Sequence, residues 1–259
     1  GEPLSLKEAL ARADSEGGGK WTVAKIAFEV FQRINRCTPV TAHALVTLVL
    51  LGQSDRALTL ADVRERVLPL LDFAKAQGLP SSQLEQLRGE GGVADTLDSL
   101  VGSGVLSRYD DGLEPVYSIE PGQHSVAAFY RNSAIHWFVN RAILEISLLD
   151  VTYEETMGPM ERAWSSGFAM RDLLKFEFFF SDKATFRDEM KSEARLLEPK
   201  FRQRVGTEET RRQVLFNAPF LIAHRVLPPF LEAYYVVADR LAAQPVDKPI
   251  DKKAFTEEC

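Results

Sequence analysis

Apolar residues recur at intervals of three and four along most of the chain, and this spacing predicts a mainly α-helical protein. The first clear stripe covers residues 21–36. A more uniformly apolar helix follows, for which Thr38 suits the N-cap and Pro39 the first helical position. Thr59 suits the N-cap of the next helix, and a third helix of this group is expected over residues 93–103.

Two short segments of alternating side chains interrupt the helical pattern. They are Leu106–Tyr109 and Val116–Ile119, separated by the turn residues Asp110, Asp111 and Gly112. Alternation on both sides of such a turn predicts a small β-hairpin. Together with the three helices before it, the hairpin predicts a winged-helix-like module over residues 38–120, preceded by leading helices in residues 1–37.

The rest of the chain, residues 121–259, is predicted to be a helical domain in which the helices form a bundle. One long helix is expected from Pro121 to about Leu149, followed by helices at residues 153–165 and 168–180. The phenylalanines at the end of the last segment are expected in the core, with a groove for a lipid tail as the less favoured alternative. They are Phe176, Phe178, Phe179 and Phe180.

Cap residues and prolines mark the remaining helix boundaries. Ser181 suits the N-cap of the helix that follows the phenylalanines, and Thr207 suits the N-cap of a later one. The last helical region, residues 213–243, must bend or break at Pro219 and at the proline pair 228–229.

A polar ridge is predicted on the long helix. Asn132, His136 and Asn140 are spaced four apart, so on a continuous helix they share one face beside Arg131, opposite an apolar stripe. Unpaired buried amides and imidazoles each cost about 1 to 3 kcal/mol, so the ridge needs hydrogen-bonding partners. An internal network that holds the bundle together is the favoured role. Substrate contact and contact with another domain are the alternatives.

The most basic short stretch of the chain is a second candidate surface. Its cations are Lys200, Arg202, Arg204, Arg211 and Arg212. They could meet lipid headgroups or an acidic partner. A solvated loop and helix start is favoured instead, because Glu208 and Glu209 are well placed for the helix dipole.

Charge and composition exclude several classes of function. The net charge is −6, and residues 81–120 carry two arginines against eight carboxylates, which argues against a nucleic-acid partner for the winged-helix-like module. No apolar run reaches the roughly 20 residues of a membrane span, so the chain is expected to be soluble or peripheral. Two cysteines, Cys37 and Cys259, suit a reducing compartment. No metal or cofactor motif is present.

Three segments of the chain resemble the C-terminal part of the bacterial, membrane-associated glycerol-3-phosphate acyltransferases. They are the string Phe129–Phe138, the segment from Ala24 to Thr41, and Pro229–Tyr234. They occur in the family's order, and the likeness is greatest to the actinobacterial members. The resemblance spans nearly the whole chain.

The catalytic motif of that family is absent from this sequence. The family uses His-x-x-x-x-Asp, in which the carboxylate orients the imidazole that acts as the general base. The chain has four histidines, and none has an aspartate five residues later. The residues at those positions are Leu48, Phe129, Arg141 and Pro229. No catalytic residue is therefore predicted, and this chain alone is expected to be inactive.

The resemblance implies an accessory role in acyl transfer. The whole polypeptide is expected to move an acyl group from acyl-CoA or acyl carrier protein to the 1-hydroxyl of glycerol 3-phosphate. Its implied partners are an upstream acyltransferase domain of the same polypeptide and an anionic membrane surface on the cytoplasmic face of the cell membrane. An independent helical module for protein interaction or regulation is the alternative, and the oligomeric state stays open.

Overall fold

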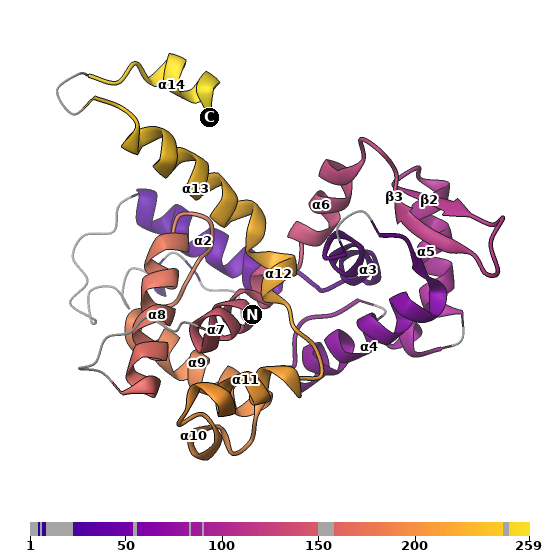
Figure 1. The fold of residues 1–259 in the computed structure, drawn as a ribbon, viewed down its shortest axis with the longest axis horizontal. Coiled ribbons are helices and arrows are strands. Elements are labelled where there is room, and N and C mark those ends of the chain that lie inside the picture. Colours follow the sequence, from indigo (N-terminus) through magenta and orange to yellow (C-terminus); the bar gives the residue numbers. More distant parts are fainter. Residues whose placement is uncertain are drawn as a thin grey trace. The chain divides into compact units, whose positions relative to one another are not determined.

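The structure is a computed structural model that describes residues 5, 7–8, 23–53, 56–82, 84–89, 91–149, 158–245 and 249–259. The described part is mainly helical, with a small three-stranded sheet, as predicted (Figure 1). The contacts divide the chain into two compact units, residues 1–136 and 137–259. Most of the predicted leading segment before Val23 lies outside the described residues, as does the start of the helix predicted at residues 153–165.

The first unit is built around one buried helix. Its helices are α2 (Val23–Cys37), α3 (Ala42–Leu51), α4 (Leu60–Ala76), the 3-10 helix η1 (Leu84–Arg88), α5 (Gly92–Gly102) and α6 (His124–Asn132). All residues of α3 from Ala44 to Leu50 are buried. Helices α4, α5 and α6 each pack against α3, which explains why its sequence is apolar on every side.

The sheet of the first unit contains the predicted hairpin. Strands β2 (Leu106–Tyr109) and β3 (Val116–Ile119) pair antiparallel, with Leu106 opposite Ile119. A short strand, β1 (Leu58–Thr59), pairs with the other edge of β3. Two residues are too few to show alternation, so β1 was not predicted. The winged-helix-like character of this unit stays a prediction.

The start of α3 differs from the sequence prediction. Thr38 and Pro39 lie outside the helix, and Thr41 is the N-cap because its side chain accepts a hydrogen bond from the Ala44 amide at 3.2 Å. The chain before Thr41 is engaged elsewhere, since the Val40 amide donates to the Pro80 carbonyl at 2.8 Å. The predicted cap at Thr59 is confirmed, and Asp62 completes a capping box with it.

The second unit surrounds another largely buried helix, α7 (Val139–Leu149). Its other helices are α8 (Pro159–Leu174), α9 (Lys183–Leu197), α10 (Phe201–Arg204), α11 (Glu208–Phe216), α12 (Ala223–Val226), α13 (Pro228–Ala242) and α14 (Lys252–Glu258). Helices α8, α9, α11 and α12 pack on α7. The predicted cap at Thr207 and the breaks near the prolines are confirmed.

The single long helix predicted from Pro121 to Leu149 is wrong. Helix α6 ends at Asn132, a short 3-10 helix, η2 (Ile135–Trp137), follows, and α7 begins at Val139. At the break the amide of Ala134 donates to the Arg131 carbonyl at 3.0 Å, three residues back instead of four. The apolar spacing continues across this tightened turn, so the sequence pattern gave no sign of it.

The predictions for the phenylalanine-rich segment also need correction. One helix, α8, replaces the two that were expected, and it ends at Leu174. Phe178 is buried, but Phe176 is 81% exposed. Asp182, not Ser181, caps α9, because its carboxylate accepts from two backbone amides while the Ser181 hydroxyl bonds to Glu189.

Among the residues that the structure describes, no helix combines the length and the apolar character needed to cross a bilayer.

Candidate functional site

Arg131 is a buried cation at the C-terminal end of α6, the helix that packs on α3. The residue is 6% exposed. Its Nε and Nη2 donate to Oδ1 of the exposed Asn132 at 3.1 and 2.9 Å. Burial lowers the pKa of the guanidinium. Within the described part of the chain Arg131 makes no ion pair, so a neutral amide is its hydrogen-bonding partner where a carboxylate would be expected.

His136 lies in η2 and reaches the C-terminal end of α2. Its Nε2 donates to the carbonyl of Asn35 at 2.9 Å. Carbonyls in the last turn of a helix have no partner within the helix, so the imidazole satisfies one of them. Burial lowers the pKa of the imidazole, although the bond to Asn35 raises it in part. His136 is therefore held as a neutral donor within the first unit.

Replacing His136 with glutamine is expected to reduce the loss of stability on acidification. Because the folded pKa of His136 lies below the usual 6.5, the unfolded chain binds this proton more readily, and the free energy of unfolding falls as the pH drops below that value. Glutamine keeps a donor but does not titrate. Urea unfolding at about pH 8 and about pH 5 measures how much the free energy of unfolding falls between these two pH values. The exposed His124→Gln serves as the control for replacing an imidazole with glutamine at the surface of the same unit. An unchanged pH dependence in His136→Gln would contradict the assignment.

Asn140 belongs to the second unit and has different neighbours. Its Nδ2 donates to Oε2 of Glu189 at 3.1 Å, and Ser181 donates to Oε1 of the same carboxylate at 2.6 Å. Its own Oδ1 is buried without a partner among the described residues. Asn132, His136 and Asn140 therefore do not form one helix face, because the break after α6 separates them.

The five cations of the basic stretch differ in their burial and in their ion-pair partners. Arg211 is buried, at 4% exposed, and Arg212 pairs with Glu208 at 2.7 Å. Arg204 pairs with Glu198 at 2.8 Å. The cations that face solvent before α11 are Lys200, Arg202 and Arg204.

A buried ion pair in α7 was missed by sequence reasoning. Arg141 and Glu145 are 1% and 2% exposed, and Nε lies 3.1 Å from Oε1. The other oxygen, Oε2, accepts from the amides of Ile222 and Ala223, both at 2.8 Å. The Arg141 guanidinium also lies over the Phe220 ring, 5.0 Å from its centroid. Opposite charges four residues apart inside an apolar helix were the available signal.

Burial and hydrogen bonding shift the pKa of the Glu145 carboxyl in opposite directions. Burial raises the pKa of the carboxyl, and the bonds from Ala223, Ile222 and Arg141 lower it in part, so the pKa remains above its usual value. These contacts join α7 to the segment that leads into α12. The Arg141–Glu145 ion pair thus has a structural role in the second unit.

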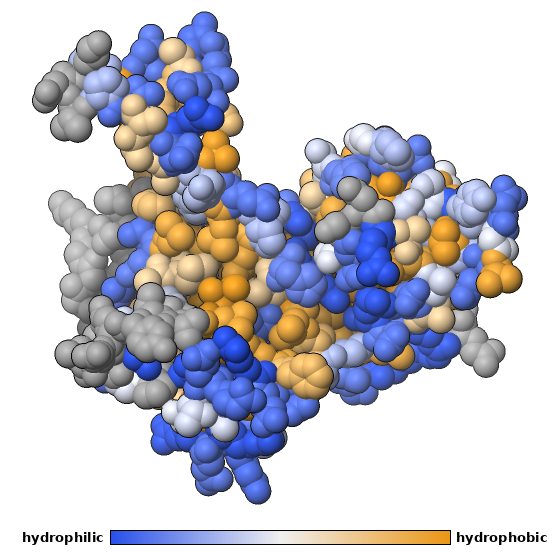
Figure 2. All heavy atoms as spheres, viewed as in Figure 1, coloured by the Kyte–Doolittle hydropathy of each residue, from blue (hydrophilic) through white to orange (hydrophobic). Residues whose placement is uncertain are grey.

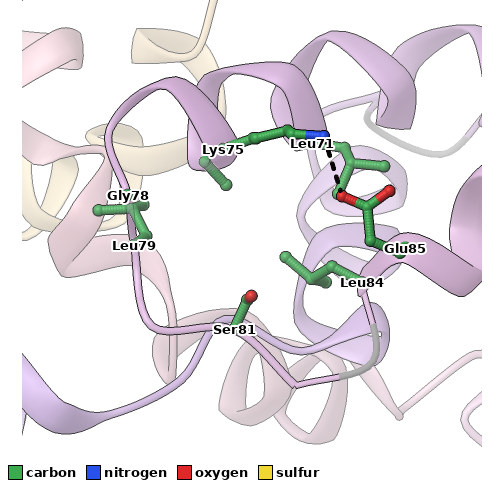
Figure 3. A pocket seen from close by; sticks show the side chains of 8 residues that line it. Leu71, Lys75, Gly78, Leu79, Ser81, Leu84 and Glu85 are labelled. Carbon is green, nitrogen blue, oxygen red and sulfur yellow. Dashed lines mark hydrogen bonds and ion pairs between the residues drawn. The ribbon is translucent and has the colours of Figure 1, made fainter.

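A cavity is found among the described residues of each unit. In the first unit, a cavity of about 360 Å³ lies between the end of α4 and η1, where Lys75 and Glu85 form an ion pair at 3.5 Å (Figure 3). In the second, a groove of about 450 Å³ is formed by α7, α11, α12 and the start of α13. Figure 2 shows apolar residues gathered over α7 and beside α12, whereas most of α11 is covered by hydrophilic residues.

Among the described residues, His43 and His224 show no recognisable catalytic arrangement. The His43 imidazole contacts the hydroxyl of Ser99 at 3.1 Å and stacks on Tyr130, and His224 accepts a hydrogen bond from Arg225. Within the part of the chain that the structure describes, no carboxylate is bonded to either imidazole in the way that a general base requires. Within the described ranges, no cluster of side chains is suited to hold a metal ion.

The comparisons with known proteins place the chain in a family. A family model of the glycerol-3-phosphate acyltransferase C-terminal region matches residues 1–259, and the chain belongs to this family. The resemblance noted in the sequence is thereby confirmed. The chain is also 41% identical to the plsB1 proteins of Mycobacterium bovis and Mycobacterium tuberculosis, whose names describe them as acyltransferases. These alignments cover 100% of the chain but 42% of each relative, so the chain spans less than half of their length.

Proposed function

We propose that this chain is the accessory C-terminal domain of an acyltransferase that acylates the 1-hydroxyl of glycerol 3-phosphate. The acyl donor is acyl-CoA or acyl carrier protein, and an upstream domain of the same polypeptide supplies the His-x-x-x-x-Asp chemistry at the cytoplasmic face of the membrane. The family match and the unmatched part of the relatives support this proposal. In it, the three helices and sheet of the first unit form a winged-helix-like docking module.

Arg131 is the observation that carries the docking role. A buried guanidinium is costly unless a carboxylate compensates it, and the described residues provide none. Asn132, whose Oδ1 accepts from the guanidinium, is exposed, so this end of α6 can be approached from outside the chain. In the proposal, a carboxylate of the upstream domain pairs with Arg131 when the two parts of the polypeptide associate.

Helix α2 supports the same role. Several of its apolar side chains are about half exposed, among them Phe28 at 48%, Phe31 at 56% and Ile34 at 54%. Exposed apolar side chains gathered on one helix are typical of an interaction surface. Because these residues occupy one short helix of the first unit, they give the upstream domain an apolar surface to bury.

Membrane contact is a separate part of the proposal. The solvent-facing cations Lys200, Arg202 and Arg204 are suited to anionic headgroups, although three charges give only weak attraction. Membrane association would therefore depend on the whole polypeptide.

Acylation of labelled glycerol 3-phosphate from acyl-CoA tests the proposed function. The upstream segment alone, this chain alone, and the two mixed are compared. Activity that requires both parts, or rises strongly on mixing, is the expected result. Activity of this chain alone would show that it holds a catalytic site. Full activity of the upstream segment alone, unchanged on mixing, would contradict an accessory role.

A further inference from the structure

The groove of the second unit exposes apolar side chains to solvent. Its walls come from α7, α11, the segment around α12, and the start of α13. Phe216 is 88% exposed, Leu149 is 51% exposed and Leu221 is 40% exposed. The volume of about 450 Å³ lies within the roughly 300 to 1,000 Å³ typical of small-molecule sites.

The polar groups that border the groove already have partners. Glu145 accepts from Arg141 and from two backbone amides, and His224 accepts from Arg225 at 3.1 Å. A peptide strand would need donors and acceptors for its backbone, and these groups do not supply them. A hydrocarbon chain needs none. The walls therefore favour an occupant that gains its affinity from the burial of apolar surface.

One cation at the rim of the groove indicates the charge expected at the polar end of the occupant. Arg212 borders the groove, and its side chain is 63% exposed. Its partner is Glu208, four residues earlier on the same helix, and exposed pairs of this kind are weak. An anionic group at the rim can therefore pair with Arg212, either together with Glu208 or in its place. The Glu145 carboxylate lies deeper, and its charge is offset by Arg141 and the amides.

We propose that this groove binds a single-chain anionic amphiphile, with the hydrocarbon chain along the apolar walls and the anionic head at Arg212. A free fatty acid is the occupant with this chemistry. The site lies entirely within residues 137–259 and requires no upstream segment. The inference is therefore independent of the proposed accessory role in acyl transfer.

Titration of the 259-residue chain with monomeric decanoate, dodecanoate and tetradecanoate tests the site. Burial of the chain predicts about fourfold tighter binding for each added methylene until the groove is filled. Affinity that does not depend on chain length would overturn the proposal. So would binding to anionic vesicles without binding to the monomers, because that result would indicate a membrane surface instead.

Two matched pairs of variants locate the ligand. Leu221→Gln, in the groove, should weaken dodecanoate binding by roughly tenfold, whereas Leu241→Gln, 45% exposed on α13 outside the groove, should leave it unchanged. Arg212→Gln should weaken dodecanoate roughly two- to fivefold but not dodecanol, and Arg202→Gln should affect neither. Equal effects within either pair would contradict the site. All four positions are exposed, and circular dichroism confirms that each variant is folded.

Discussion

Replacing Glu145 with leucine is expected to lower the free energy of unfolding by about 3 to 5 kcal/mol. The substitution leaves Arg141 as a buried charge without its partner and removes the acceptor of the Ile222 and Ala223 amides. Since small domains are stabilised by only about 5 to 15 kcal/mol, this loss should be plain in urea unfolding of the 259-residue chain.

A matched variant and a double variant distinguish the loss of the Arg141–Glu145 ion pair from the general effect of introducing leucine. Glu208 forms an exposed pair with Arg212 at the same spacing of four residues, so Glu208→Leu should cost at most about 1 kcal/mol. Arg141→Met combined with Glu145→Leu should be more stable than Glu145→Leu alone, because no unpaired charge remains. A double variant that is less stable than Glu145→Leu would contradict this explanation.

Replacing Arg131 with methionine is expected to weaken association with the upstream segment by about 2 to 5 kcal/mol, or roughly thirtyfold to several thousandfold. The isolated chain should be as stable as wild type or more stable, because methionine fills similar space without a buried charge. Calorimetric titration of the upstream segment with each form of the chain measures the difference.

The matched control for Arg131 is Arg108, an exposed arginine of the same unit that pairs with Asp110. Arg108→Met should change the association by less than about 1 kcal/mol. If Arg131→Met instead lowers the stability of the isolated chain by about 1 to 3 kcal/mol and leaves association intact, Arg131 has an internal structural role.

Local signals in the sequence predicted those parts of the fold that neighbouring residues determine. Thr59 and Thr207 cap helices through residues three positions away, and the hairpin follows from alternation around Asp110–Gly112. Strand β1 was missed because it is two residues long and exists only through its pairing with β3. The true cap of α3, Thr41, was missed because Val40 pairs with a distant segment.

The candidate site was harder to predict, since it depends on contacts between residues far apart in sequence. The ridge prediction assumed a continuous helix, and the tight turn after Asn132 contains no glycine or proline to mark it. The partners of Glu145 lie 77 and 78 residues away. The burial of Arg131 likewise follows from the packing of α6 on α3, which the spacing of apolar residues does not reveal.

Hydrogen–deuterium exchange of the 259-residue chain, with and without the upstream segment, tests most directly whether this chain docks through the surface around Arg131. The account predicts slower exchange in residues 124–137 when the upstream segment is present, with little change in the β2–β3 hairpin. Unchanged exchange throughout residues 124–137, at concentrations where the two parts form a complex, would contradict it.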